Sequence, residues 1–388
     1  MLKKLMAVMM AVCLVLAVAG CGSSTPASSS APSESSSASE SAPAEAGMKI
    51  AVITSPSGVD DGSFNQDVYN GILNFIKNNP TATVTAIQEK DIANSVPAVA
   101  DVVADYDVIV TPGFQFAGVG VIAQENPEKK FILVDSFPTD ASGAEVVVDN
   151  MYAMQFAEQE SGFFAGIAAA MESKTGKVAV VNGIAYPSNV NYQYGFEAGV
   201  AYANAKLGTK CQTVEIASYA GTDVTGANVG GNYVGDFNDP ATGKVVGNAL
   251  IAEGCDILFV AAGNSGNGVF TAAKEASSEI KVIGCDVDQY DDGANGDKNI
   301  VLTSGLKNMA LNVERQLTAI ADGSFKGGNN LLKADTDSTG FVSAEGRHQL
   351  GEATVKACQD AYELVKAGTI VPPSNFSGTT AEDFPGLK

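Results

Sequence analysis

Residues 48–77, MKIAVITSPSGVDDGSFNQDVYNGILNFIK, decide the fold of this chain. The stretch begins with an apolar, β-branched run, continues through a segment that contains Pro and Gly, and ends in an amphipathic pattern. This order predicts a strand, a turn and a helix. We expect Ser63 to be the helix N-cap, with Gln66 completing a capping box. The turn then places Phe64, Asn65 and a pair of acids at a strand-to-helix connection, where open α/β sheets bind small ligands.

The alternation of strand and helix patterns continues along the chain and predicts an α/β fold. Short apolar runs that alternate with helices imply parallel sheets covered on both faces. A long helix of small residues, predicted over 154–172, separates two such units. The predicted strands lie at 49–54, 83–88, 108–111, 131–135 and 145–148, and then at 177–181, 213–218, 257–261 and 281–286.

Two consecutive doubly wound units indicate two lobes of ordinary domain size. The first lobe is predicted over 48–150, with 287–325 returning to it. The second is predicted over 151–286, with 326–388 closing onto it. Within the returning segment, a short strand at 300–303 is expected to rejoin the first lobe.

The N-terminal residues indicate where the protein works. Two lysines precede an apolar run, and small residues stand directly before Cys21. We interpret residues 1–20 as a lipoprotein signal peptide and Cys21 as the lipidation site, with an ordinary signal peptide or a short membrane span as alternatives. Acyl chains would then anchor the protein to the outer face of the cell membrane. Residues 21–47, rich in Ser, Ala, Pro and Glu, are expected to be a disordered tether.

Charge and composition exclude several classes of function. A net charge of −21 makes the chain a poor partner for nucleic acid, and its even spread indicates a solvated surface. The only histidine is His348, which argues against a Ser-His-Asp or Cys-His mechanism and against the common zinc sites.

The cysteines of the expected lobes include no CxxC pair, and the sequence leaves open whether they form disulfides. They are Cys211, Cys255, Cys285 and Cys358.

Polar and aromatic residues follow many of the predicted strands. Because ligands in this kind of sheet bind beyond the carboxyl ends of the strands, we expect both lobes to face one cleft. Acids, amides and aromatic rings that face each other suit an uncharged polar ring system. The residues are Ser55, Asp60, Asp61, Phe64, Asn65, Gly113, Phe114, Phe116, Asp135 and Ser136 in the first lobe, and Asn182, Gly183, 236–239, 263–268 and 285–289 in the second.

Two motifs in the second lobe have alternative interpretations. The loop GNSGNG at 263–268 has neither the dinucleotide fingerprint nor the P-loop spacing. A tight strand-to-helix turn, with Gly263 allowing close approach to a ligand, is favoured over a phosphate cradle. Asp286 and Asp288 lie on one face of a strand end. We interpret Asp286 as an acceptor for ligand hydroxyl groups, with metal binding and a structural or hinge role as alternatives.

Phe64 and Phe237 each stand among polar loop residues, outside any helix or strand periodicity. We interpret them as rings that stack on the two faces of a planar base; the alternative is that each fills the core of its own lobe. Lys307 follows a short strand. Its position allows a bond to a ligand oxygen, whereas most isolated lysines are exposed to solvent.

Eight motifs follow one another along residues 48–372 and are specific as an ordered set. They are DDGSFNQ at 60–66, FILVDS at 131–136, SGFFAGIAAAM at 161–171, GFEAGV at 195–200, VGDFNDP at 234–240, FVAAGNSGNGVF at 259–270, IGCDVDQY at 283–290 and LTSGLKN at 302–308. Through these motifs the chain resembles the basic membrane protein (BMP) family of lipoproteins, the PnrA-like substrate-binding proteins of ABC transporters.

This resemblance implies the type I periplasmic binding protein fold, two Rossmann-like lobes joined by a hinge of three strands. It implies that Phe64 and Phe237 stack on a base and that Asp135 hydrogen-bonds it. Asn65, Gly263, Asp286 and Lys307 match positions associated with the nucleoside, the last two with ribose. Together with Asp61, these residues form the predicted ligand-binding set.

Two positions depart from the family pattern. Ser55 stands where the family usually has an aspartate, and Gly62 replaces a lysine within the DDKSFN-like motif. The missing aspartate removes an acceptor for ligand hydroxyl groups. A different nucleoside, a free base or another flat heterocycle such as riboflavin therefore remains an alternative ligand.

The predicted function is capture of a nucleoside, with a purine base, for uptake by a membrane permease. No enzyme activity, cofactor or resident metal is expected, and the protein is expected to be a monomer. A nucleoside hydrolase that uses Asp60, Asp61 or Asp286 is one alternative. A receptor that reports its ligand to a membrane signalling partner is the other.

Overall fold

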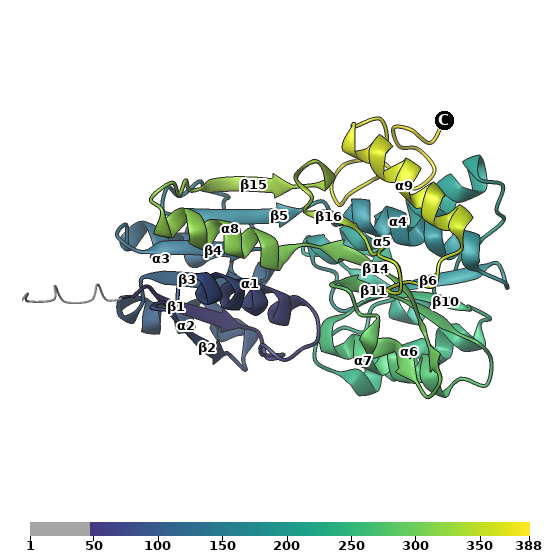
Figure 1. Cartoon of the computed structure of the whole chain (residues 1–388), viewed down its shortest axis with the longest axis horizontal. Coiled ribbons are helices and arrows are strands. Elements are labelled where there is room, and N and C mark those ends of the chain that lie inside the picture. Colours follow the sequence, from purple (N-terminus) through teal and green to yellow (C-terminus); the bar gives the residue numbers. More distant parts are fainter. Residues whose placement is uncertain (1–46) are drawn as a thin grey trace, which may run out of the picture. The chain divides into compact units, whose positions relative to one another are not determined.

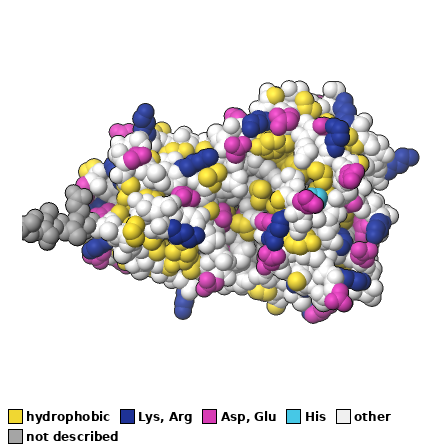
Figure 2. Space-filling model, in the orientation of Figure 1, with side chains coloured by type: hydrophobic (Ala, Val, Ile, Leu, Met, Phe, Trp, Pro, Cys, Tyr) yellow, Lys and Arg dark blue, Asp and Glu magenta, His cyan; other side chains and the backbone are white. Residues whose placement is uncertain are grey.

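The computed structural model describes residues 47–388 (Figure 1). The expected signal peptide, the lipidation site Cys21 and all but the last residue of the expected tether lie outside the described residues. None of the helices within residues 47–388 combines the length and the apolar composition that crossing a membrane requires. On the face drawn in Figure 2, acidic and basic side chains are interspersed with apolar and uncharged ones.

The first lobe is built on a six-stranded parallel sheet with the order β15-β5-β4-β3-β1-β2. Successive residues of β1 alternate between two apolar clusters, one on each face of the sheet. Helices α1 and α8 contribute to the cluster on one face, and α2 and α3 to the cluster on the other. The elements are β1 (Lys49–Thr54), α1 (Phe64–Asn78), β2 (Thr83–Gln88), α2 (Ser95–Val102), β3 (Val108–Pro112), α3 (Val119–Glu125), β4 (Lys130–Val134), β5 (Met151–Phe156), α8 (Met309–Ala321) and β15 (Gly328–Leu332).

The second lobe has a six-stranded sheet with the order β16-β14-β11-β10-β6-β7, in which only β16 is antiparallel to its neighbour. Helices α4, α5 and α9 share one apolar cluster with this sheet, and α6 and α7 share another. The elements are α4 (Glu158–Glu172), β6 (Lys177–Asn182), α5 (Pro187–Lys206), β7 (Gln212–Thr213), α6 (Pro240–Ala252), β10 (Ile257–Ala261), α7 (Gly263–Glu275), β11 (Lys281–Asp286), β14 (Val301–Lys307), β16 (Thr339–Phe341) and α9 (Glu352–Lys366). Two small hairpins pair β8 (Gly221–Thr222) with β9 (Asn228–Gly230) and β12 (Ala294–Asn295) with β13 (Lys298–Asn299).

Glycine residues of α4 and α5 allow these two helices to pack closely against each other. A Cβ atom on Gly166 would lie 2.1 Å from the Phe196 carbonyl oxygen of α5, and one on Gly199 would lie 2.1 Å from the Phe163 carbonyl oxygen of α4. Only glycine at these positions lets the two helix backbones approach so closely. This close helix pair forms much of the core of the second lobe.

The chain passes between the two lobes at three places. The crossings lie between β5 and α4, between β14 and α8, and between β15 and β16. In Figure 1 these connections lie at the centre of the described part of the chain, where β5, β14, β15 and β16 meet. They form the three-segment hinge of this fold.

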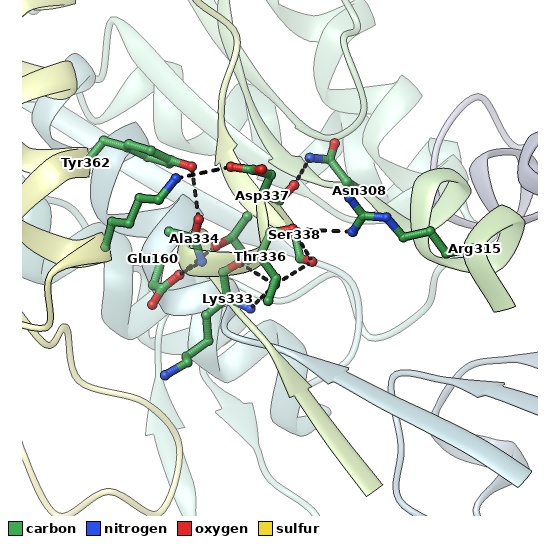
Figure 3. A network of polar contacts seen from close by, with 11 residues as sticks. Glu160, Asn308, Arg315, Lys333, Ala334, Thr336, Asp337, Ser338 and Tyr362 are labelled. Atoms are coloured by element: carbon green, nitrogen blue, oxygen red, sulfur yellow. Dashed lines mark hydrogen bonds and ion pairs between the residues drawn. The ribbon is translucent and has the colours of Figure 1, made fainter. Parts of the chain in front are cut away.

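One turn of α4 hydrogen-bonds to the hinge crossings. Glu160 accepts hydrogen bonds from the Ala334 backbone nitrogen in the third crossing (2.8 Å) and from the Thr339 hydroxyl at the start of β16 (2.6 Å). The Ser161 hydroxyl donates to the Leu306 carbonyl at the second crossing (2.6 Å). Figure 3 shows Asn308 of the second crossing donating to the Asp337 carbonyl of the third. The hinge is therefore one connected polar cluster.

The lobe boundaries differ from those expected from the sequence. Residues 151–156, expected in the second lobe and partly in its first helix, form β5 of the first sheet. The sequence MYAMQF suits either structure, and pairing with β4 and β15 makes it a strand. Residues 300–303, expected to rejoin the first lobe, belong largely to β14, which pairs with β11 in the second sheet. Residues 328–332, expected in the second lobe, form β15 of the first.

Two predicted strands are wrong or too long. At 145–148, only Glu145 forms an isolated bridge, to Thr139. The strand predicted over 213–218 is reduced to Gln212–Thr213 at the edge of the second sheet. Both segments lie beside a sheet edge or in a loop, where an apolar run has few partners with which to form a ladder.

Candidate ligand-binding site

A cavity of about 480 Å³ lies between the carboxyl ends of the two sheets. This is where doubly wound sheets bind ligands. The structure brings all eight predicted ligand-binding residues to its wall, and they come from both lobes. They are Asp61, Phe64, Asn65 and Asp135 from the first lobe, and Phe237, Gly263, Asp286 and Lys307 from the second. Of the other strand-end candidates, Phe116 is buried in the core of the first lobe instead.

Asp61 caps helix α1. Its carboxylate accepts hydrogen bonds from the backbone nitrogens of Ser63 (3.0 Å), Asn65 (2.9 Å) and Gln66 (3.0 Å). Ser63 occupies the predicted N-cap position, but its side chain makes no capping bond, so the expected capping box does not form. The Gln66 side chain does reach back, accepting from the Gly62 nitrogen at 2.9 Å. Asp61 thereby holds the first residues of α1, among them Phe64 and Asn65, against the cavity.

Lys307 is a buried cation at the centre of the site. Its side chain is 2% exposed, which excludes the alternative of a solvent-exposed lysine. The ammonium group pairs with Asp135 and, at 3.1 Å, with Glu158. It also lies 5.1 Å from the centroid of the Phe64 ring. Burial by itself lowers the pKa of Lys307, but the surrounding carboxylates, Asp135 first, outweigh it and raise that pKa.

Glu158 is a partner of Lys307 that the sequence did not reveal, and it does not itself line the cavity. It begins α4 directly after the first hinge crossing and is 2% exposed. The helix predicted from residue 154 places Glu158 in the helix interior. In the structure, α4 begins at Glu158. Had the strand β5 been recognised, the acid at the start of the next helix would have been a candidate.

The two aspartates at the strand ends have unusual backbone conformations. Asp135 has φ 66° and Asp286 has φ 68°, and both belong to the few non-glycine residues with positive φ among the described residues. Such conformations are uncommon and cluster at functional sites. Burial raises the pKa of Asp135, although Lys307 opposes the rise. Asp286 accepts hydrogen bonds from the Tyr192 hydroxyl (2.7 Å) and the Ser63 hydroxyl (3.3 Å).

Two acceptor oxygens in the cavity wall have no donor among the described residues. Asn65 Oδ1 is buried without a hydrogen bond, while its Nδ2 donates to the Ser55 hydroxyl at 3.1 Å. Asp135 Oδ1 is also buried and unpaired, while Oδ2 contacts Lys307. Buried polar atoms are normally paired, so each of these oxygens requires an explanation. Both residues line the cavity, where a ligand with N–H or O–H groups would supply the missing donors.

Aromatic rings form other parts of the wall. The Phe237 ring lies against Gly183, where a Cβ atom would be 2.3 Å from it. Tyr186, which the sequence did not single out, contacts Phe237 at 5.9 Å between ring centroids and Phe114 at 5.3 Å. Phe114 belongs to the first lobe and Tyr186 to the second, so this contact crosses the cleft. Phe64 lines the cavity and also packs on the core of its lobe. It is therefore placed both to contact a ligand and to fill the core, the two roles that the sequence suggested.

The remaining motif residues have structural roles. The GNSGNG segment is the start of α7, and only Gly263 of that segment lines the cavity, with φ 53°. Asp288 pairs with Arg347 at 2.7 Å, on the surface. Within residues 47–388, no group of three or more His, Cys, Asp or Glu side chains is arranged to hold a metal ion. The four cysteines of this region are free and buried.

Comparison with known sequences identifies relatives over most of the chain. Over 343 residues it is 27% identical to the CD4+ T-cell-stimulating antigen of Listeria monocytogenes, covering 84% of this chain and 87% of that protein. Over 351 residues it is 28% identical to the ABC transporter nucleoside-binding protein BmpA of Lactococcus lactis, covering 84% and 89%.

Comparison with solved structures establishes the fold. An ABC transporter solute-binding protein from Aeropyrum pernix superposes with a TM-score of 0.70 at 23% identity, covering 85% of this chain and 94% of that one. The architecture is that of the type I periplasmic binding proteins. The model of the family described as "Bmp: ABC transporter substrate-binding protein PnrA-like" matches residues 48–223 and 217–375. The chain therefore belongs to the Bmp family of PnrA-like ABC transporter substrate-binding proteins.

Proposed function

We propose that this protein is an extracytoplasmic lipoprotein that binds a nucleoside, with a purine base, between its lobes and delivers it to an ABC permease. Family membership accounts for the transporter class, because substrate-binding proteins of ABC importers act outside the cytoplasm. The Lactococcus relative is named as a nucleoside-binding protein, which supports the choice of ligand. Lipidation at Cys21 and a monomeric state belong to the same proposal.

The observation that carries the nucleoside proposal is the pair of unpaired acceptors, Asn65 Oδ1 and Asp135 Oδ1. An unsatisfied buried polar atom costs about 1–3 kcal/mol, so a ligand that donates to both oxygens recovers a substantial free energy. A nucleobase carries N–H donors on a flat ring. The rings of Phe64 and Phe237 line the same cavity, and stacking of a base on an aromatic ring contributes about 1–3 kcal/mol.

The charge of the site favours an uncharged ligand. Five aspartates and two lysines line the cavity: Asp61, Asp91, Asp135, Asp236 and Asp286, and Lys90 and Lys307. A site with more acids than bases repels phosphate groups, whereas a neutral nucleoside enters without an electrostatic penalty. We therefore expect nucleosides to bind much more tightly than the corresponding nucleotides.

The polar end of the cavity suits a sugar. Asp286 accepts hydrogen bonds, Lys307 donates them, and both line the cavity. Ser55 offers only a hydroxyl group in place of the family's aspartate, and this hydroxyl already accepts from Asn65. Sugar recognition then depends on Asp286 and Lys307, which makes their contacts decisive for the choice between a nucleoside and a free base.

Isothermal titration of the mature protein against nucleosides, their free bases, nucleotides, riboflavin and monosaccharides tests the proposal. We expect a purine nucleoside to bind most tightly and nucleotides to bind weakly. Binding of a sugar or of riboflavin in preference to every nucleoside would refute the nucleoside assignment. Chromatography of the incubated mixtures provides the second readout, because release of free base would indicate the hydrolase alternative instead.

Membrane attachment and assembly have separate tests. The full-length chain is expected to fractionate with membranes, and Cys21→Ser is expected to release it. Light scattering of the mature protein should give the mass of one chain. Attachment that survives Cys21→Ser, or a stable dimer, would contradict the corresponding part of the proposal.

A further inference from the structure

The carboxylate of Asp286 is held by hydroxyl groups from both lobes. Tyr192, on α5 of the second lobe, donates to one of its oxygens at 2.7 Å. Ser63, beside α1 of the first lobe, donates to the other at 3.3 Å. The Cys285 thiol also contacts the oxygen that Tyr192 holds, at 3.5 Å. Each carboxylate oxygen has two acceptor positions, so the oxygen that faces Ser63 keeps one position for a ligand.

The bond from Tyr192 is the stronger of the two and lies within one lobe. Tyr192 is 3% exposed, and its ring packs edge-on against Phe259 with centroids 5.6 Å apart. Burial raises the pKa of Tyr192 well above its ordinary value, so its hydroxyl stays a donor throughout the physiological pH range. The Ser63 contact is longer and crosses the cleft, so it depends on how the two lobes approach each other.

Asp286 has a competing partner in Lys307. The Asp286 carboxylate contributes to raising the pKa of the lysine, although the ion pairs of Lys307 are with Asp135 and Glu158. A carboxylate that turned fully onto the ammonium would lose its remaining acceptor positions for a ligand. Tyr192 lies close to both groups: it donates to Asp286, and its ring centroid is 6.0 Å from the Lys307 nitrogen.

We propose that Tyr192 is a positioning residue that holds the Asp286 carboxylate apart from Lys307 and thereby keeps it available for the hydroxyl groups of a sugar. This inference rests on the proposed function, because it assigns Tyr192 to the sugar end of the same site. It makes Tyr192 a determinant of specificity: the hydroxyl favours ligands that carry a sugar over the free base.

The test uses Tyr192→Phe, which removes the hydroxyl and keeps the ring. Titration compares a nucleoside, its 2′,3′-dideoxy form and the free base. The expected result is about tenfold weaker binding of the nucleoside, in line with the loss of one hydrogen bond to a charged group, and unchanged binding of the free base. The matched control is Tyr202→Phe on the same helix, whose ring packs against Phe163 at 5.3 Å; it should bind all three ligands like the unaltered protein.

A double-mutant cycle with Asp286→Asn shows whether Tyr192 acts through Asp286. The effect of Tyr192→Phe on nucleoside binding should be smaller in the Asp286→Asn background. Equal losses for all three ligands, or an effect that is the same in both backgrounds, would overturn the positioning role. Either result would leave nucleoside binding by the unaltered protein intact, so failure of this inference is distinct from failure of the proposed function.

A crystal structure of the ligand-free Tyr192→Phe protein supplies a readout that needs no ligand. In this variant the Asp286 carboxylate is expected to move onto the Lys307 ammonium. A carboxylate that keeps its place without the tyrosine hydroxyl would overturn the inference, whatever the ligand of the cavity proves to be.

Discussion

Asp135 and Asp286 occupy equivalent places in the two lobes. Asp135 directly follows β4 and Asp286 ends β11, and each of these strands is third from the corresponding edge of its sheet. Both residues have left-handed backbone conformations, with φ of 66° and 68°. Their partners differ, however, because Asp135 pairs with Lys307 whereas Asp286 is held by Tyr192 and Ser63. The two aspartates therefore occupy equivalent positions in their sheets but have different hydrogen-bond and ion-pair partners.

This difference predicts distinct effects of two matched substitutions. Asp135→Asn removes a charge from the lysine pair and alters the unpaired acceptor Oδ1, so we expect weaker binding of both free base and nucleoside. Asp286→Asn should weaken binding of the nucleoside and leave the free base unaffected. Titration calorimetry with both ligands measures the two patterns, and each variant serves as the control for the other. Identical patterns would show that the two acids do not recognise different parts of the ligand.

Removing the buried cation should destabilise the folded protein. Lys307→Met leaves Asp135 and Glu158 without their partner, and breaking a buried pair in this way costs about 3–5 kcal/mol. Lys174→Met is the control, because the Lys174–Glu279 pair is exposed and such pairs contribute about 0–1 kcal/mol. Urea unfolding followed by circular dichroism compares the variants. Equal unfolding midpoints for both would contradict a structural contribution from the buried pair.

The position of the Phe237 ring should depend on Gly183. Phe237→Ala is expected to weaken nucleoside binding by about 1–3 kcal/mol through loss of stacking. Gly183→Ala places a methyl group 2.3 Å from the present ring position, so the ring must move and affinity should also fall. Phe376→Ala is the control, because that ring is 65% exposed and lies outside the cavity wall. Normal affinity in Gly183→Ala would show that the ring position does not matter for binding.

The stability of the protein should decrease from mildly acidic to alkaline pH. Burial raises the pKa of Glu197 to about 8 and that of Asp67 to about 7, so both carboxyl groups bind protons more tightly in the folded state. Unfolded carboxyl groups titrate near pH 4, so each group lowers the free energy of unfolding by about 1.4 kcal/mol per pH unit as the pH rises, from about 4 to 7 for Asp67 and from about 4 to 8 for Glu197.

Urea titrations near pH 5.5 and pH 8.5 measure this dependence. Glu197→Gln has no proton to lose and should show a smaller difference between the two conditions. The control Glu128→Gln, at an exposed position, should retain the difference of the unaltered protein. A difference as large in Glu197→Gln as in the unaltered protein would rule out Glu197 as its source.

The position of the cavity could be predicted from the sequence because it follows from sheet topology. Residues after parallel strands meet at one edge of a sheet, and this rule predicts that Asp135, Gly263, Asp286 and Lys307, which line the cavity, lie together. Cavity residues that lie inside a helix were harder to find. Tyr192 lies in a helix interior, where the sequence does not reveal which side faces the other lobe. Asp61 lies two residues before the N-cap position, Ser63, so N-cap preferences alone do not predict its bonds to the first backbone nitrogens of α1.

The hinge cluster described above determines how closure can be observed. Glu160 and Ser161 are adjacent on α4 and bond to the second and third crossings, while the first crossing leads directly into the same helix. We expect these bonds to make the three crossings move as one unit when the lobes rotate, so that distances across the cleft change together. A single optical reporter then follows the whole motion. The chain contains no tryptophan. Phe114→Trp, beside Tyr186, would therefore introduce the one source of tryptophan fluorescence, at a contact that crosses the cleft.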